Sequence, residues 1–190
     1  MNKIIKIEPL PKYFSITWML GSFCNYDCSY CPAYWHDTTS RPHDLNQLKT
    51  AWTNIYNKTQ HLNLEYKISF TGGEVTANKN FLPLVEWIRA EYPSVAMILV
   101  TSNGSASANY YTKLAQAVES ISFSTHSEFM IEEEFFDKAA RVNSVMIRPE
   151  KSFHVNIMNE SWNAEGIARY KQFLDTHHIS YSVNEIADGL

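Results

Sequence analysis

Residues 24–31 read Cys-Asn-Tyr-Asp-Cys-Ser-Tyr-Cys, and the three cysteines of this stretch are the only ones in the chain. Four thiolates normally complete an iron–sulfur cluster, and four nitrogen or sulfur ligands complete a structural zinc site. Three closely spaced thiolates, from Cys24, Cys28 and Cys31, therefore predict a metal centre with one open coordination position, where a further ligand can bind.

Two other interpretations of these cysteines remain open from the residues alone. They could hold a structural zinc ion completed by His36 or His43, or they could be buried free thiols. Structural zinc sites usually show a second CxxC pair or an HxxxH motif, and the chain has neither. The odd cysteine count and the lack of an apolar secretory signal near the N-terminus disfavour disulfides, so we expect an intracellular, cytoplasmic protein with reduced thiols.

The spacing CxxxCxxC after a short apolar strand resembles the signature of the radical S-adenosylmethionine (radical SAM) enzymes. In that family the residue before the third cysteine is typically aromatic or apolar and packs near the adenine of SAM. Tyr30 occupies that position here. The resemblance therefore implies that Tyr30 contacts the cofactor.

A second motif strengthens the resemblance. The family has a Gly-Gly-Glu sequence at the end of its second strand, and this chain has Gly72, Gly73 and Glu74 after the apolar run at residues 66–70. Glycines allow a backbone to approach a ligand closely, and a carboxylate can accept a hydrogen bond from the SAM ammonium group. The family often continues with Pro-Thr, whereas Val75 and Thr76 follow here.

The resemblance implies two cofactors and a reaction. Three thiolates would hold a [4Fe-4S] cluster whose fourth iron chelates SAM. One electron from the reduced cluster would cleave SAM to methionine and a 5′-deoxyadenosyl radical, which abstracts hydrogen from a substrate carbon. An electron donor such as flavodoxin or ferredoxin would be needed. Three cysteines leave none for a second cysteine-ligated cluster.

Four more residues at expected strand ends are candidates for this site. Asn103, Ser124 and Asn156 are candidates for SAM contacts, by the resemblance to related enzymes. His126 is a candidate catalytic residue toward the substrate, since imidazole exchanges protons near neutral pH. For each residue a structural role is the alternative, as a turn residue, a satisfied interior amide or a core histidine.

Apolar runs alternate with helical periodicity along the chain, which indicates parallel βα units. We expect six strands and five helices, with Asp44 and Asn80 as caps of the first two helices, Pro83 in the first turn of the second, and a possible extra strand at Val145–Ile147. The expected strands are 14–20, 66–70, 96–101, 120–124, 153–158 and 179–185, and the expected helices are 45–59, 81–91, 106–118, 131–141 and 164–176.

The length predicts the class of barrel. A closed eight-unit barrel needs about 250 residues, and this chain has 190. We therefore expect an α/β fold, a partial (β/α)6 open TIM-like barrel, in a single radical SAM core domain over residues 1–190. Its motifs should meet at the carboxyl ends of the strands.

Charge and hydropathy limit the partners. The net charge of −4 argues against broad nucleic-acid binding, and no stretch approaches the roughly 20 apolar residues of a membrane span. An open barrel mouth suits a large substrate or a partner protein. The substrate class stays open between nucleotides and peptides, and the alternatives are a glycyl-radical-activating enzyme and a non-enzymatic zinc-binding module.

Overall fold

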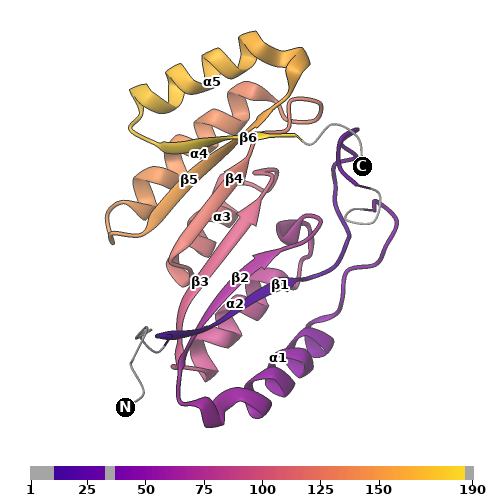
Figure 1. The fold of residues 1–190 in the computed structure, drawn as a ribbon, viewed down its shortest axis with the longest axis vertical. Helices are drawn as coiled ribbons and strands as arrows, with labels where there is room; N and C mark the ends of the chain where they lie inside the picture. The colour runs from indigo at the N-terminus through magenta and orange to yellow at the C-terminus, as the bar shows by residue number, and fades with distance from the viewer. Residues whose placement is uncertain (1–10, 33–36, 187–190) are drawn as a thin grey trace, which may run out of the picture.

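The computed structural model describes residues 11–32 and 37–186, which form one six-stranded parallel sheet and its connecting helices (Figure 1). The strands are β1 (Tyr13–Met19), β2 (Glu65–Thr71), β3 (Val95–Ser102), β4 (Ser120–Ser124), β5 (Ser152–Asn159) and β6 (Ser180–Glu185). The helices are α1 (Leu45–Thr59), α2 (Phe81–Glu91), α3 (Ala108–Ala117), α4 (Glu132–Met146) and α5 (Ala164–Thr176). Short 3-10 helices lie at η1 (Gln60–Leu62), η2 (Val75–Ala77) and η3 (Ser161–Asn163).

The strands lie side by side in sequence order from β1 to β6, and every neighbouring pair is parallel. An α-helix connects each strand to the next. Within the described residues β1 and β6 are the two edges, so the sheet stays open. This confirms the expected six-stranded, partial-barrel α/β fold, while its extent as a domain over residues 1–190 stays a prediction.

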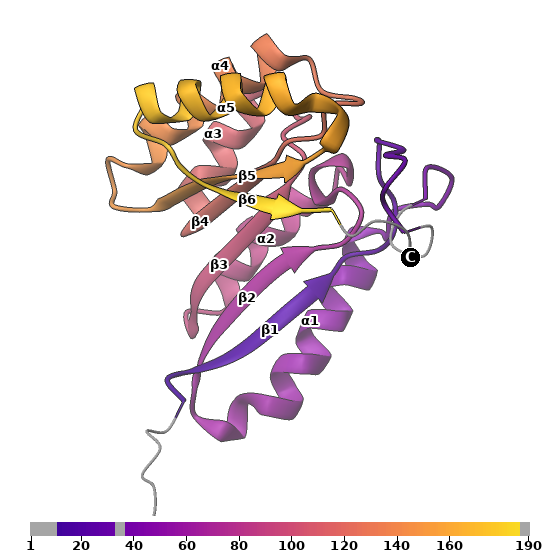
Figure 2. The ribbon, with the colours of Figure 1, turned by 45° about the horizontal axis from the view of Figure 1, so that its top comes forward.

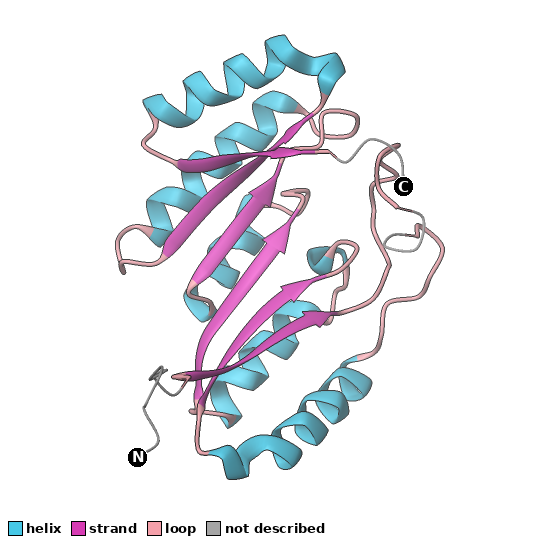
Figure 3. Ribbon diagram, viewed as in Figure 1, coloured by secondary structure: helices cyan, strands magenta, loops and turns pink. Residues whose placement is uncertain are grey.

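The helices cover one face of the sheet. In Figure 3 the strands lie in front of α2, α3 and α4, and Figure 2 shows α4 and α5 over β5 and β6. Every second strand residue points into this layer, as the pleat requires. Ile68, Ile98, Ile121 and Val155 are fully buried there. Each such side chain stabilises the fold by roughly 1.5–3 kcal/mol, so the helix-covered face holds the core.

The intervening strand residues lie on the other face, which we call the open face. Most of them are only partly buried, and they are rich in hydroxyl and amide groups. Strand pairing sets Ser122 beside His154, Ser124 beside Asn156, and Asn156 beside Ser182. The open face therefore offers hydrogen-bonding groups where the covered face offers hydrocarbon.

Helices α1, α2 and α5 begin at the expected residues, whereas α3 begins at Ala108 instead of 106 and α4 at Glu132 instead of 131. The two expected caps differ in their side chains. Asp44 caps α1 in a capping box, since its carboxylate accepts a hydrogen bond from the Gln47 backbone and the Gln47 side chain accepts one from the Asp44 backbone. Asn80 precedes α2, which contains Pro83, but its amide donates to the carbonyl oxygen of His43 and caps nothing. Asn80 therefore occupies the N-cap position of α2, as expected, but its side chain does not accept a hydrogen bond from the helix backbone.

The possible extra strand at Val145–Ile147 is wrong. Helix α4 runs through Met146, five residues beyond the expected end at Arg141. Val142 and Met146 are fully buried and continue the spacing of Phe135 and Ala139 on one side of the helix. The apolar residues near position 145 therefore belong to the buried side of helix α4 and not to a strand. No helix of the described residues is long and apolar enough to cross a membrane.

Candidate functional site

The loop after β1 carries all three cysteines at the carboxyl end of the sheet (Figure 1). Its thiols are free; Cys28 is buried, and Cys24 and Cys31 are partly buried. The backbone N–H of Cys31 donates to the Cys28 carbonyl oxygen at 3.0 Å, and the N–H of Tyr26 donates to the Cys24 sulfur at 3.4 Å. The loop is therefore turned tightly around its own sulfurs.

The charges of the three thiols influence one another. Burial, together with the smaller effects of the charges of Glu128, Cys24 and Cys31, raises the pKa of the Cys28 thiol to about 12, against a hydrogen bond with Tyr30 that lowers it. Burial also raises the pKa of Cys24 and of Cys31. Thiolates in such a place need a compensating positive charge, which bound iron supplies. Three free thiols on one loop are a donor set in which each sulfur can bind a different iron of an iron–sulfur cluster.

The two glycines of the Gly-Gly-Glu motif allow the cysteine loop to approach β2. A Cβ atom on Gly73 would lie 2.2 Å from the Phe23 carbonyl oxygen, and one on Gly72 would lie 2.5 Å from the Gly21 carbonyl oxygen. Gly72 also has a φ of +129°, which favours glycine. The N–H groups of Gly73 and Glu74 donate to the carbonyl oxygens of Gly21 and Phe23 at 2.9 and 2.7 Å. The motif therefore holds the start of the cysteine loop.

Glu74 is buried, with 3% of its surface exposed, and its carboxylate faces protein donors. Oε1 accepts hydrogen bonds from the backbone and hydroxyl of Thr76 at 2.9 and 2.6 Å and from the hydroxyl of Ser102 at 2.7 Å. Oε2 accepts one from the backbone N–H of Asn103 at 2.6 Å. Burial raises the pKa of Glu74, and these four bonds act against that rise. The carboxylate thus joins the ends of β2 and β3.

Asn103 extends this junction to the cysteine loop. Its side-chain amide donates to Asn25 Oδ1 at 3.0 Å, and Asn25 follows the first cysteine. Asn103 also accepts a bond from the backbone of Ser105 at 3.0 Å, so it stabilises its own turn. The expected meeting of the cysteine loop, the Gly-Gly-Glu turn and the turn after β3 is present in the structure.

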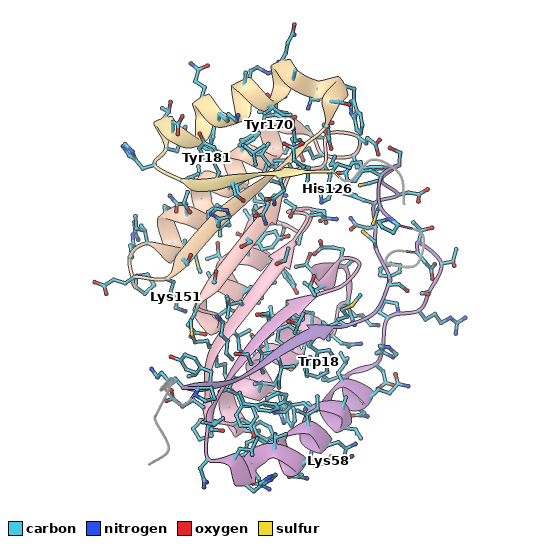
Figure 4. All side chains as sticks on the ribbon, viewed as in Figure 1. Trp18, Lys58, His126, Lys151, Tyr170 and Tyr181 are labelled. Carbon is cyan, nitrogen blue, oxygen red and sulfur yellow. The ribbon has the colours of Figure 1, made fainter. Side chains whose placement is uncertain are left out.

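Tyr30 and His126 lie together beside Cys28. Their rings are stacked with centroids 6.1 Å apart, and the Tyr30 hydroxyl is 2.6 Å from His126 Nδ1. The same nitrogen is 3.5 Å from the Cys28 sulfur, and Figure 4 shows His126 at the end of β4 beside the loop. Burial lowers the pKa of His126 to about 4, so the ring is neutral near neutral pH. Contact of His126 with a substrate stays a prediction.

Ser124 and Asn156 form a separate polar pair on the open face. They are direct neighbours in the β4–β5 register, and Asn156 Oδ1 accepts a hydrogen bond from the Ser182 hydroxyl at 3.1 Å. Nearby, the Asn156 carbonyl oxygen accepts one from the Thr125 N–H at 2.9 Å. The pair adjoins the cysteine loop through His126, two residues beyond Ser124. Their role toward SAM stays a prediction.

Two residues that the sequence did not single out touch the cysteine loop. Glu160 accepts a hydrogen bond from the Tyr30 hydroxyl at 3.1 Å, and Glu128 accepts one from the Ser29 backbone at 2.7 Å. Both lie just beyond strand ends, in the segments that follow β5 and β4. That position at the carboxyl edge is a signal that could have identified them.

The described residues form no ligand group for a single metal ion, and this holds for Cys24, Cys28 and Cys31 as well as for any set with His43. Among residues 11–32 and 37–186 no three His, Cys, Asp or Glu side chains are grouped so as to hold one metal ion. His36 lies outside the described residues. His43 lines a cavity of about 180 Å³ with Arg41, between the start of the cysteine loop and the Gly-Gly-Glu turn.

Known proteins resemble this chain in sequence and in fold. A curated relative, GTP 3′,8-cyclase from Pasteurella multocida (strain Pm70), is 31% identical over 96 residues, which cover 49% of this chain and 27% of the relative. A structure titled anSMEcpe with bound AdoMet has a TM-score of 0.65 at 16% identity, covering 93% of this chain and 52% of its own. Streptococcus suis SuiB, bound to precursor peptide SuiA, has a TM-score of 0.69 at 15% identity, covering 93% and 40%.

These proteins are longer than the chain, which spans about half or less of each. The two structures, at such low identity, show a shared fold. A family model described as a 4Fe-4S single cluster domain matches residues 16–145, which include the three cysteines, the Gly-Gly-Glu turn and the ends of β3 and β4. The chain belongs to this single-cluster 4Fe-4S family.

Proposed function

We propose that this protein binds a [4Fe-4S] cluster through Cys24, Cys28 and Cys31 and cleaves SAM reductively. The observation that carries the proposal is the set of three free thiols on one loop, inside the segment that the 4Fe-4S family model matches. The bound, reduced cluster supplies one electron to SAM, which yields methionine and a 5′-deoxyadenosyl radical able to abstract hydrogen from a substrate carbon.

The residues around the loop receive distinct roles in this proposal. Gly72 and Gly73 bring the β2 end against the loop, and Glu74 orients that end toward β3. Any contact of Glu74 with the SAM ammonium group uses the side of the carboxylate at Oε2, which accepts one bond from protein whereas Oε1 accepts three. Tyr30 packs beside the adenine.

The open face and its end at β4 and β5 complete the proposed site. Ser124 and Asn156 bind the ribose or carboxylate of SAM. His126, the proposed catalytic residue, exchanges a proton with the substrate through Nε2, since Nδ1 is engaged by Tyr30 in this structure.

The substrate is a nucleotide or a peptide. The cyclase relative, whose name refers to GTP, supports the first class, and SuiB, whose structure holds a precursor peptide, supports the second. The hydroxyl and amide groups of the open face can donate and accept bonds with either class. The same proposal includes a macromolecular substrate or partner protein at the open mouth. It also includes flavodoxin or ferredoxin as the electron donor, in a reducing cytoplasmic compartment.

Anaerobic purification and reconstitution test the proposal. The wild type should be brown, hold four irons per chain, and form 5′-deoxyadenosine from SAM with a chemical reductant. Each of Cys24→Ala, Cys28→Ala and Cys31→Ala should lose cluster assembly and SAM cleavage together. Ser152→Ala, an exposed serine at the start of β5, is the control and should retain iron. A colourless wild type with one zinc, or a cysteine variant that still forms 5′-deoxyadenosine, would refute the proposal.

A further inference from the structure

Ser29, the first residue between the second and third cysteines, is bonded to a distant carboxylate. Its backbone N–H donates to Glu128 Oε2 at 2.7 Å, and its hydroxyl donates to the other oxygen of the same carboxylate. Glu128 lies in the segment between β4 and α4 and is exposed, while Ser29 follows β1. The bond therefore joins segments that are 99 residues apart.

Tyr30, the second of these residues, is bonded to a buried carboxylate. Its hydroxyl donates to Glu160 Oε1 at 3.1 Å, and Glu160 is only 1% exposed. Glu160 also accepts bonds from the backbone N–H of Ser127 at 3.0 Å and from the Ser127 hydroxyl. Three donors of the described residues therefore meet this one buried carboxylate.

The hydrogen bonds of Tyr30 form a short chain. A phenol has one proton, and the bond to Glu160 uses it, so the 2.6 Å contact with His126 Nδ1 places a proton on that nitrogen. His126 then donates to Tyr30, and Tyr30 donates to Glu160. All three side chains become fixed relative to one another, next to the Cys28 sulfur.

The two carboxylates also act on one segment. Glu160 holds Ser127, and the next residue, Glu128, holds Ser29. The cysteine loop is thus bonded at both ends, since Gly73 and Glu74 hold its start at the β1–β2 side. In the sheet order, β1 is at one edge and β4 and β5 are the fourth and fifth strands. The loop therefore spans the mouth of the open sheet (Figure 1).

We propose that Glu128 and Glu160 form a clasp that holds the cysteine loop against the ends of β4 and β5. The clasp positions the metal centre relative to Ser124 and Asn156, and its two negative charges disfavour addition of an electron to that centre. Both carboxylates are positioning residues, since they act through Ser29 and Tyr30. The inference rests on the proposed function only where it concerns the cluster.

Hydrogen exchange measures the mechanical part of the clasp. In the anaerobically purified protein, the Ser29 amide should exchange about tenfold faster in Glu128→Ala, because the loss of one bond to a charged acceptor exposes that N–H to solvent. Glu160→Ala should accelerate exchange of the amides over residues 24–31. Tyr30→Phe removes the same bond without altering the buried carboxylate, so it gives the test if Glu160→Ala fails to fold.

Redox titration measures the electrostatic part. Glu128→Gln and Glu160→Gln keep an acceptor oxygen of the same size and remove the charge. The midpoint potential of the cluster should become less negative in each variant, which a purely structural role would not cause. Glu165→Gln, an exposed carboxylate on α5, is the matched control and should leave exchange and potential unchanged.

Two results would overturn the clasp. The first is that the backbone amides of residues 24–31 exchange at the wild-type rate in folded Glu128→Ala and Tyr30→Phe proteins. The second is a wild-type midpoint potential in Glu160→Gln. If the wild type assembles no cluster, the proposed function fails, but the exchange comparison still runs on the iron-free protein and tests the clasp by itself.

Discussion

The hydroxyl of Ser102 donates a hydrogen bond of 2.7 Å to Glu74 Oε1, and this bond joins the carboxyl end of β3 to the carboxyl end of β2. Both side chains are buried. The same hydroxyl is 2.6 Å from the Tyr111 hydroxyl on α3, so the junction continues into the helix layer. The strand ends that frame the cysteine loop are thereby fixed by a polar network inside the protein.

Removal of the Glu74 carboxylate should destabilise this network. Glu74→Ala leaves buried donors of Thr76, Ser102 and Asn103 without an acceptor, and the free energy of unfolding should fall by about 3 kcal/mol. Urea unfolding measures the change. Glu86→Ala, at an exposed position of α2, is the control and should change stability little. A loss no larger than that of the control would show that other acceptors replace Glu74.

A methyl group at Gly73 should displace the cysteine loop. The Cβ of Gly73→Ala would lie 2.2 Å from a backbone oxygen of Phe23, which cannot rotate away. We expect a stability loss of about 2 kcal/mol and less than half of the wild-type iron content after reconstitution. Gly166→Ala is the control: its Cβ meets the Asn163 side chain, which can rotate, so iron content should be retained. Full iron loading of Gly73→Ala would contradict the close approach.

Acid should destabilise the open face through His154. Its ring nitrogens contact the hydroxyls of Ser180 and Ser182 at 3.0 and 3.1 Å, and burial lowers its pKa from 6.5. The unfolded state therefore binds the proton more tightly than the folded state. The stability that neutral His154 provides is fully present above about pH 6.5 and is lost as pH falls through the folded-state pKa.

Urea unfolding at pH 7.5 and pH 5 measures this effect. His154→Gln keeps hydrogen-bonding groups at this position and cannot gain the proton. Between the two pH values, the wild type should lose more of its free energy of unfolding than the variant loses. Equal losses would mean that His154 binds its proton equally well in both states.

The capping box should set the stability of α1. In Asp44→Ala the first turn loses the acceptor that binds the Gln47 N–H at 2.9 Å, and the free energy of unfolding should fall by about 1 kcal/mol. Thermal unfolding followed by circular dichroism measures this loss. Asn54→Ala, at an exposed position within the same helix, should be neutral or slightly stabilising. A loss in both variants would assign the effect to something other than the cap.

Local patterns predicted the order of the elements because each strand and helix buries its own periodic residues. The expected strand at residues 120–124 is β4 as observed, and the expected helix at residues 45–59 is α1. The prediction of an extra strand at Val145–Ile147 was wrong because these residues continue the periodic pattern of a helix. A short apolar run has no period of its own, and the helical spacing of Phe135, Ala139, Val142 and Met146 decided the structure.

The site was only partly predictable. Cys24, Cys28, Cys31 and Glu74 belong to motifs with fixed local spacing, so the sequence singled them out as candidates, and their cofactor contacts stay predictions. Glu128 and Glu160 have partners 99 and 130 residues away, and no local spacing encodes such bonds. The close contact that requires glycine at position 73 was also not predictable, because it is made with the backbone of Phe23 in the loop after β1.

The open face has a consequence for how the protein behaves in water. Along β4, β5 and β6 it presents mostly hydroxyls, amides and an imidazole, among them Ser122, Ser124, His154, Asn156 and Ser182. Water hydrogen-bonds to such a surface, so burying the surface against another molecule releases little hydrophobic free energy. This half of the sheet can remain uncovered with little hydrophobic drive toward self-association, while the hydrocarbon on its reverse side is shielded by the helices.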